Sequence, residues 1–240
     1  TVCRRLTNNP SYYPNFTTKK SYIDIIIPAH NVHHVISDAL YSIMTQKISD
    51  CVRVYIANNG SAKNYQKEVK RFQKYLNIKE LIVPKGCNPI QYGVDNSSSE
   101  YVTILEPTDL YNDCYSLYYL LNGLKTQKGA HLSSGKLNIC LNGRFNIYDS
   151  NNTFIYGKLF LRSFLRKLKV ESMEDLFAAI ALFRPGPMKN IPTYINRKNG
   201  KEKIDYIDPS LEEVLKPTYG IMIYQEQIMQ IARIMASYTL

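Results

Sequence analysis

The sequence predicts an α/β fold: an open, mostly parallel sheet with flanking helices, followed by a mainly α-helical C-terminal segment. Apolar runs of strand length alternate with helical patterns through the first half of the chain, which is typical of parallel strands joined by right-handed crossovers. The run YIDIIIPAHN at residues 22–31 has three consecutive isoleucines closed by a proline, which indicates a strand buried on both faces. Helical patterns dominate after about residue 164.

The first strand sets the order of the elements that follow. Pro28 ends this strand because proline has no N–H to donate to a ladder. Apolar residues between Val32 and Met44 then fall at helical spacing and form one face of a helix. The further expected elements are strands at 52–57, 81–83 and 101–105, helices at 65–76, 112–125, 172–182 and 225–236, and a strand candidate at 221–224.

Polar clusters follow three of the predicted strands: 29–31, 58–61 and 106–109. The carboxyl ends of neighbouring parallel strands lie side by side, and an open α/β sheet binds its ligand in the crevice outside those ends. The same clusters also fit ordinary turns. In particular, Glu106 and Asp109 fit a turn that caps the helix expected at 112–125. Three clusters in register favour the binding site.

Composition narrows the class of protein. The 240 residues carry a formal net charge of +10, which suggests polyanionic partners such as nucleic acid, sugar nucleotides or a membrane surface, or else a solvated lysine-rich face. Five widely spaced cysteines form no CxxC pair, so we expect a reduced, cytoplasmic protein. We find no apolar run long enough for a membrane span and no signal peptide. Residues 1–20 read as an irregular arm, and both ends look cut from something longer.

Several motifs between residues 21 and 165 resemble the family 2 glycosyltransferases, which have a Rossmann-like, nucleotide-sugar-binding fold. The matching text comprises IIIPAHN, the helix residues Asp38-Ala39-Leu40-Tyr41-Ser42 with Gln46, the turn NNGS, Gly93 eight residues before Tyr101, the motif LEPTD, and IYGKLFLRSFL at 155–165. The chain departs from the family by having Asn58-Asn59 in place of a paired aspartate, Gln91 in place of a common asparagine, and one aspartate fewer in LEPTD.

The resemblance implies inverting transfer of a sugar from a UDP-type nucleotide-sugar to an acceptor whose identity the sequence does not give. It also implies a divalent cofactor, Mn²⁺ or Mg²⁺. The nucleotide-sugar-binding residues that it implies are Pro28, Ala29, Asn31, Asn58, Asn59 and Gln91. Asp109 is the metal candidate, supported by Glu106, because a divalent ion on a diphosphate needs only one or two carboxylates. In the family the general base lies beyond the sheet in a Glu-Asp pair, which here is Glu174-Asp175, so Asp175 is a weak candidate.

From about residue 164 the chain closely resembles the start of the fingers region of the bacterial DNA polymerase III alpha subunit. The signature segments are EDL at 174–176, FRPGPM at 183–188, YI at 194–195 with RK at 197–198, PTYG at 217–220 and YQEQIMQ at 224–230. This second resemblance casts doubt on Asp175 as a transferase base.

The polymerase-like segment implies a possible contact with DNA. Residues 158–203 contain eleven Lys or Arg against four Asp or Glu, and Arg184, Arg197 and Lys198 are the phosphate-binding candidates. A solvated basic face or a helix C-cap contact would also explain them. No Asp-x-Asp occurs in the chain, whereas polymerisation needs paired aspartates holding two metal ions. We therefore expect no polymerase activity.

The predicted organisation is an arm at 1–20, a glycosyltransferase-like domain at 21–163 and a polymerase-like helical fragment at 164–240. Three hypotheses stay open: a glycosyltransferase, a nucleic-acid-binding module, or a chimera joined near residues 160–170 in which neither piece has a complete site. Because the helical fragment is short and its apolar faces normally pack on a larger region, we expect weak docking or local disorder after about residue 185.

Overall fold

The computed structural model describes residues 22–30, 32, 35–60, 65–126, 130, 132–135, 137–141, 144–148, 157–184 and 186–237. The chain divides into two compact units with a boundary between Arg166 and Lys167. We call the described residues up to 166 the sheet unit and residues 167–237 the helical unit. The predicted arm at 1–20 lies outside the described residues.

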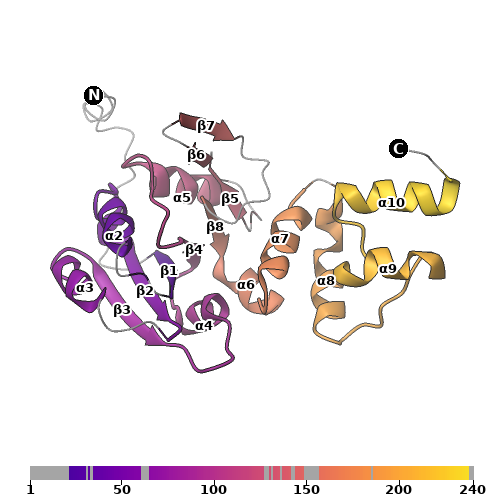
Figure 1. Ribbon diagram of the computed structural model, residues 1–240, viewed down its shortest axis with the longest axis horizontal. Helices are drawn as coiled ribbons and strands as arrows, with labels where there is room; N and C mark the ends of the chain where they lie inside the picture. Colours follow the sequence, from indigo (N-terminus) through magenta and orange to yellow (C-terminus); the bar gives the residue numbers. More distant parts are fainter. Residues whose placement is uncertain are drawn as a thin grey trace. The chain divides into compact units, whose positions relative to one another are not determined.

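The sheet unit is built on a six-stranded, mostly parallel sheet (Figure 1), which confirms the predicted fold class. Strand β1 pairs in parallel with β2 on one side and with β4 on the other, and β2 pairs in parallel with β3. Strand β8 runs antiparallel to β4 and β5. The strand order is β3 (Asn77–Ile82), β2 (Val52–Asn58), β1 (Ile23–Ala29), β4 (Tyr101–Ile104), β8 (Lys158–Leu161), β5 (Leu132–Ser134). Strands β6 (Leu137–Leu141) and β7 (Arg144–Tyr148) form a separate antiparallel pair.

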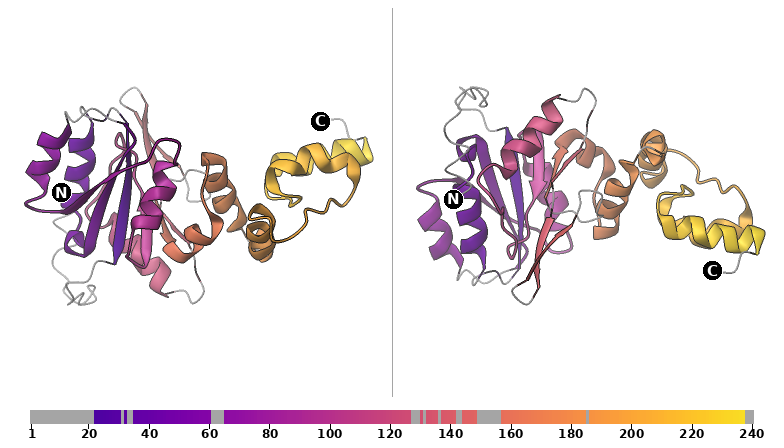
Figure 2. Two further views of the ribbon diagram at one scale, coloured as in Figure 1. Left: turned by 90° about the horizontal axis from the view of Figure 1, so that it is seen from below. Right: turned by 90° about the horizontal axis from the view of Figure 1, so that it is seen from above.

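Helices cover both faces of this sheet (Figure 2). Ile23, Ile25 and Ile27 of β1 belong to one apolar core with residues of α2 (Ile36–Met44), α3 (Gln66–Phe72) and α5 (Ser116–Thr126). Because successive side chains of a strand point to opposite faces, Ile26 lies on the other face, where it meets Gly93 of α4 (Pro89–Asn96). Strand β1 is apolar on both sides because α4 packs on one face of the sheet and α2, α3 and α5 pack on the other.

Strand β1 is the most deeply buried part of the sheet unit. Its residues from Ile23 to Ile27 are fully buried, Asp24 included. Each isoleucine contributes about 1.5–3 kcal/mol to folding by leaving water. The Asp24 carboxylate is satisfied because it accepts hydrogen bonds from the backbone N–H of Ser98 and Ser99 at 2.7 Å each and from the Ser99 hydroxyl at 2.8 Å. Asp24 therefore anchors the loop that leads into β4.

The helical unit contains the two helices that the sequence predicted around 172–182 and 225–236, namely α7 (Met173–Leu182) and α10 (Gln225–Ala236). Between them lie α8 (Ile191–Lys198), α9 (Glu212–Leu215) and the 3₁₀ turns η4 (Pro187–Asn190), η5 (Pro209–Leu211) and η6 (Lys216–Thr218). Helix α6 (Arg162–Leu168) crosses the boundary between the units. The expected local disorder after residue 185 is not what the structure shows, because residues 186–237 form hydrogen-bonded helices and turns.

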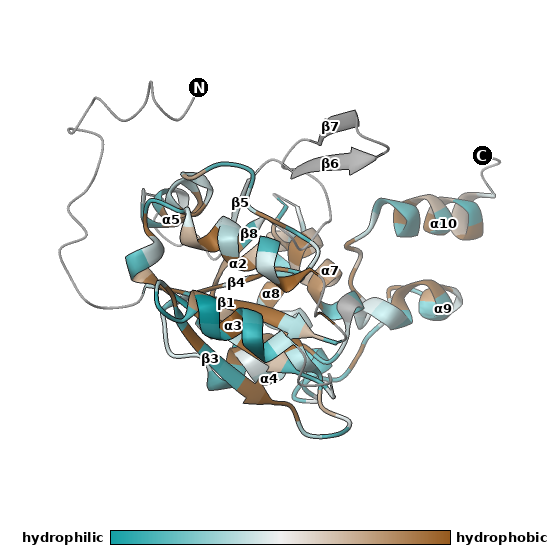
Figure 3. Cartoon of the chain, turned by 60° about the vertical axis from the view of Figure 1, so that its left-hand side comes forward, coloured by the Kyte–Doolittle hydropathy of each residue, from teal (hydrophilic) through white to brown (hydrophobic). Residues whose placement is uncertain are grey.

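The strand candidate at 221–224 is wrong. The Gln227 side-chain oxygen accepts the backbone N–H groups of Ile223 and Tyr224 at 3.0 and 3.1 Å, so these groups are not available to a ladder. Helix α10 keeps a mixed surface (Figure 3), with Ile228 and Met235 more than half exposed. Among the described residues, no helix is long and apolar enough to cross a membrane.

Candidate functional site

The three predicted polar clusters meet at one edge of the sheet. Ala29 at the end of β1 pairs with Asn58 at the end of β2, and Ile26 pairs with Ile104 at the end of β4. The chain stays bound to β1 beyond both neighbours: the Asn59 N–H donates to the Ala29 oxygen and the Leu105 N–H donates to the Ile26 oxygen, each at 3.0 Å. The strand order 3-2-1-4 reverses direction at β1, and this is the switch point where open α/β sheets bind ligands.

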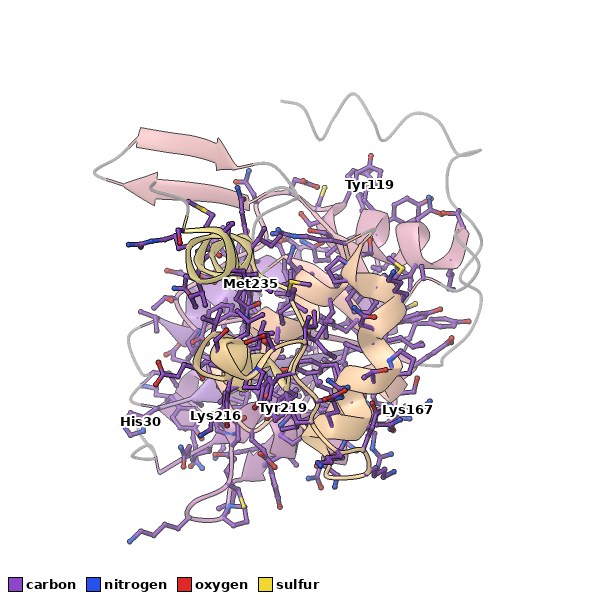
Figure 4. The ribbon with its side chains drawn as sticks, turned by 90° about the vertical axis from the view of Figure 1, so that its right-hand side faces the viewer. His30, Tyr119, Lys167, Lys216, Tyr219 and Met235 are labelled. Carbon is purple, nitrogen blue, oxygen red and sulfur yellow. The ribbon has the colours of Figure 1, made fainter. Side chains whose placement is uncertain are left out.

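The cluster at the end of β1 contains the buried Ala29, which is the last residue of the strand, and His30; Pro28, just before it in the strand, is half-buried. Asn31 lies outside the described residues. His30 is exposed (Figure 4), and its Nδ1 lies 3.0 Å from the Asn59 backbone oxygen, which ties this loop to the one after β2. The sequence prediction missed His30, although it stands inside the YIDIIIPAHN run.

The cluster after β2 is braced by Glu80 of β3, another residue that sequence reasoning missed. The Asn58 amide nitrogen donates to Glu80 Oε1 at 3.2 Å, the Tyr65 hydroxyl donates to the same oxygen, and Gln66 donates to Oε2 at 3.4 Å. Burial, and then the Glu80 carboxylate, raise the pKa of Tyr65. Because Glu80 holds the Asn58 amide nitrogen, the orientation of that amide is fixed. Asn59 is exposed.

Gln91 lies in the first turn of α4. The Asn88 side chain caps this helix by accepting the N–H groups of Ile90 and Gln91 at 2.9 and 3.1 Å. The Gln91 amide donates to Asp95 one turn later at 2.8 Å. Helix α4 sits unusually close to β1, because a Cβ added to Gly93 would lie 2.5 Å from Ile26 Cγ2. Glycine at 93 is thus a packing requirement.

Glu106 and Asp109 form a tight turn directly after β4, in which the Asp109 N–H donates to the Glu106 oxygen at 2.9 Å. Both residues are half-buried, and burial raises the pKa of the Asp109 carboxyl. The alternative that Asp109 caps the next helix is wrong, because α5 starts at Ser116 and Asp113 accepts the Tyr115 N–H at 2.7 Å. Within the part of the chain that the structure describes, no three His, Cys, Asp or Glu residues gather around a metal position.

The two carboxylates nevertheless fit a divalent ion of the kind implied by the sequence. Mg²⁺ keeps several waters and binds through one or two carboxylates plus substrate phosphates, so it does not need a protein cage. A cation beside Asp109 would also offset the cost of burying its charge. Glu106 and Asp109 therefore stay the predicted ligands of a metal-bound diphosphate.

Two further residues of the glycosyltransferase-like motifs, Ser42 and Gln46, support this edge through hydrogen bonds. Gln46, which is buried after α2, donates to the oxygens of Ser42 and Asp113 and accepts the Leu117 N–H at 3.1 Å. The Ser42 hydroxyl accepts the Tyr111 N–H at 3.1 Å. These bonds fix the segment that follows Asp109 against α2.

Asp175 lies in the helical unit, as the third residue of α7. Its carboxylate accepts the N–H groups of Glu171 and Ser172 at 2.8 and 3.1 Å, and the Ser172 hydroxyl completes a capping box. The Lys198 ammonium lies 3.2 Å from the same carboxylate, and its side chain is 3% exposed. These contacts give Asp175 and Lys198 a role in holding α7 and α8 together; the catalytic role of Asp175 and the phosphate contact of Lys198 stay predictions.

Arg197 is also engaged within its own unit. Its guanidinium donates to Glu202 at 3.1 Å and to the backbone oxygens of Asp205 and Tyr219 at 3.3 and 3.1 Å. Tyr219 and Gly220 both adopt positive φ, and a Cβ on Gly220 would lie 2.6 Å from the Asp205 oxygen. The PTYG segment therefore makes a tight turn that brings the Tyr219 backbone oxygen to the Arg197 guanidinium. By contrast, Arg184 is exposed, and its guanidinium makes no hydrogen bond or ion pair with the described residues.

Comparison with known proteins gives two kinds of match, one in sequence and one in fold. The family model of the bacterial DNA polymerase III alpha subunit finger domain matches residues 124–240. The C-terminal half of the chain resembles that finger domain. DNA polymerase III subunit alpha of Staphylococcus aureus (strain Mu50) is 54% identical over 79 residues, which is 33% of this chain and 7% of that protein. The Chlamydia trachomatis subunit is 41% identical over 134 residues, 49% of this chain and 11% of that protein. The chain thus spans about a tenth or less of these relatives.

The solved structures with a similar fold are glycosyltransferases. S. aureus TarS 1–349 in complex with UDP-GlcNAc aligns with a TM-score of 0.51 at 16% identity, covering 64% of this chain and 52% of TarS. The mannosyltransferase PcManGT of Pyrobaculum calidifontis, in complex with GDP-Man and Mn²⁺, gives a TM-score of 0.53 at 16% identity, covering 75% and 58%.

These findings confirm both resemblances drawn from the sequence. The finger match begins at residue 124, well before the predicted start near 164, and so extends into the sheet unit.

Proposed function

We propose that the sheet unit is a glycosyltransferase that binds a nucleotide-diphospho-sugar and transfers its sugar to an acceptor hydroxyl. The observation that carries this proposal is the register of β1, β2 and β4, which brings the ends of these three strands to one switch-point edge. The likeness in fold to TarS and PcManGT supports it.

The nucleotide would lie over the ends of β1 and β2. Pro28 and Ala29 end β1, Asn58 ends β2 and Asn59 comes next, and Gln91 lies in the first turn of α4. Asn31 comes two residues after Ala29 in the sequence. Asn58 donates to Glu80 through its amide nitrogen, and an amide oxygen is a group that can accept an N–H from a base. Uracil carries such an N–H, so a UDP-type donor is the form that this edge suits.

Glu106 and Asp109 would hold Mn²⁺ or Mg²⁺ against the diphosphate, and the ion would supply neutralisation of the leaving-group charge. The proposed reaction is direct displacement with inversion. The acceptor oxygen bonds to the anomeric carbon, the bond from that carbon to the diphosphate oxygen breaks, and the diphosphate leaves with the electron pair. A general base takes the acceptor proton, and Asp175 stays only a prediction for that role.

Calorimetry of the full chain with UDP and Mn²⁺ tests this proposal. We expect saturable heat that depends on Mn²⁺ and is lost in Asp109→Asn. An Asp113→Asn variant is the matched control, because the Asp113 carboxylate accepts the Tyr115 N–H just before α5 and Asp113 is not a metal candidate. Absence of heat at millimolar ligand would contradict the proposal.

A second candidate function, favoured by the exposed Arg184 in a finger-like unit, is binding of nucleic acid. We expect salt-dependent binding of primed DNA that weakens in Arg184→Ala, because neutralising phosphates releases counterions. Arg197 and Lys198 are poor probes, because their loss would disturb folding first. Binding equal to that of the parent chain in Arg184→Ala would count against this candidate.

The alternative to both candidates is a chimera, and we propose it as the reading that holds if neither activity is found: the join near residues 160–170 would then connect two pieces of different origin, neither with a complete active site. Its support is that the chain matches glycosyltransferases in fold and DNA polymerase III alpha subunits in sequence. Sequencing the genomic locus across codons 150–175 tests it. Continuous native reads through the join would remove this chimera hypothesis.

A further inference from the structure

Lys158 is a nearly buried lysine at the same sheet edge as the proposed nucleotide site. It is the first residue of β8 and is 3% exposed. Strand β8 runs antiparallel to β4, with Thr103 opposite Leu159. The start of β8 therefore lies where β4 ends, and Lys158 is level with Ile104, two residues before Glu106.

The side chain of Lys158 lies on the face of the sheet that α4 covers. Leu159 belongs to the core shared with α2, α3 and α5, so its neighbour Lys158 points to the opposite face. Helix α4 packs on that face through Gly93 and Ile26, and its first turn, which contains Gln91, follows the end of β3. Lys158 thus shares both the edge and the face with the predicted nucleotide-binding residues Pro28 and Gln91.

The ammonium group of Lys158 is held in place. It donates to the Ser134 hydroxyl at 2.6 Å, and Ser134 is the last residue of β5, paired with Lys158 across the ladder. A cation in such a water-poor position interacts more strongly with an anion than an exposed lysine does, because the effective dielectric constant is lower.

We propose that Lys158, positioned by Ser134, is the cationic contact for the diphosphate of the nucleotide-sugar. This inference rests on the proposed function and deepens it. A nucleoside diphosphate carries its charge on the phosphates alone, and Glu106 and Asp109 are themselves anionic. An edge that binds such a donor therefore benefits from a fixed positive charge, and Lys158 provides it from the start of β8, the strand next to β4.

Calorimetry of the full chain with UDP and with uridine, both with Mn²⁺, tests Lys158 directly. In Lys158→Met, which keeps the length of the side chain, we expect UDP affinity to fall about tenfold to hundredfold. Uridine, which lacks the phosphates, should bind as it does to the parent chain. Lys85→Met is the matched control, because Lys85 follows β3 near this edge but is exposed, and both affinities should be unchanged.

Each outcome is informative. If the parent chain binds no UDP, the proposed function fails and this inference falls with it. If the parent binds UDP and Lys158→Met binds it equally well, the Lys158 assignment is overturned while the function stands. Should Lys158→Met fail to fold in a thermal melt, Lys158→Arg and Ser134→Ala replace it: partial retention of UDP affinity in the first and a several-fold loss in the second support the assignment. Unchanged UDP affinity in Ser134→Ala, or an equal loss of UDP and uridine in any folded variant, overturns it.

Discussion

The polar residues of the polymerase-like motifs and those of the glycosyltransferase-like motifs differ in how far they are buried and in what they bind. In the helical unit, Arg197, Lys198 and Gln227 are turned inward and bind groups of their own unit. In the sheet unit, Asn59, Glu106 and Asp109 follow strand ends and stay exposed or half-buried. The helical unit shares high identity with its relatives, yet its matched residues mainly maintain packing. The sheet unit has 16% identity to its structural neighbours, yet it keeps polar groups where a ligand could reach them.

High sequence identity to a relative therefore does not by itself indicate that a unit keeps polar groups accessible to a ligand. Identity in the helical unit preserves a set of internal hydrogen bonds, which any folded copy needs. In the sheet unit the topology alone places strand ends together, so few specific residues are needed to build an edge.

The largest expected effect comes from Lys198 in the helical unit. Lys198→Met leaves the buried Asp175 carboxylate without its cation, and removing one partner of a buried pair costs about 3–5 kcal/mol. Denaturant unfolding followed by hydrogen exchange over α7 and α8 measures this loss. The exposed Lys201→Met is the control, with a change within about 0.5 kcal/mol. Equal stability of both variants would show that Lys198 is a surface residue free to bind phosphate.

Two buried glutamines allow the same change in each unit. Gln46 joins α2 to the segment before α5, and Gln227 joins α10 to Val214 and Thr218. Each substitution to leucine orphans several buried groups, and we expect a loss of about 2–4 kcal/mol in the unit that carries it.

Hydrogen exchange should locate the loss of protection in 36–126 for Gln46→Leu and in 211–236 for Gln227→Leu. The exposed Gln73→Leu and Gln230→Leu serve as controls. A substitution that leaves its own unit fully protected would contradict the roles given to these amides.

Gly93→Ala tests the close approach of α4 to β1. The added Cβ would lie 2.5 Å from Ile26 Cγ2, and overpacking of this kind costs about 1–3 kcal/mol. Gly186→Ala is the control: its φ is −75° and a Cβ there meets nothing within 4 Å, so its stability should be unchanged or slightly higher. Thermal unfolding of both variants compares them, and a neutral Gly93→Ala would mean that α4 packs more loosely.

Asp109→Asn should have the smallest effect on stability and the opposite sign. Burial raises the folded-state pKa of Asp109 above its unfolded value, so the fold opposes the charged form. The asparagine variant should be slightly more stable at neutral pH, within about 0.5 kcal/mol, and this gain should vanish as pH falls and Asp109 itself becomes protonated. Unfolding between pH 4 and 8 checks the trend; a loss of stability at neutral pH would show that the charge of Asp109 is satisfied in the fold.

The sequence predicted the parallel sheet and its strand-end clusters because β1 and β4 are short apolar runs closed by polar turns, which local composition reveals. It did not predict α4, and it placed β3 at 81–83, whereas the strand is Asn77–Ile82. Only one residue of β3, Ile78, is buried, so alternating apolar residues hardly mark this edge strand.

The contacts that define the candidate site could not be predicted for a different reason. These contacts join neighbouring strands: Glu80 binds Asn58, and Lys158 binds Ser134. In each pair the two residues are more than 20 positions apart in the sequence. Sequence spacing does not carry such long-range pairings; strand register does. In the helical unit, Arg197 and Lys198 are phosphate-ligand candidates by residue type, and their internal acceptors and their burial became visible only in the structure.

We infer that the sheet unit binds the nucleotide-sugar, whereas the residues of the polymerase-like motifs maintain the packing of the helical unit. Hydrogen exchange of the full chain with and without a UDP-sugar and Mn²⁺ tests it most directly. We expect added protection in peptides covering 28–30, 58–60, 88–91 and 105–109, and unchanged exchange across 186–237. Unchanged exchange at the strand ends, together with ligand-induced protection confined to 186–237, would contradict it.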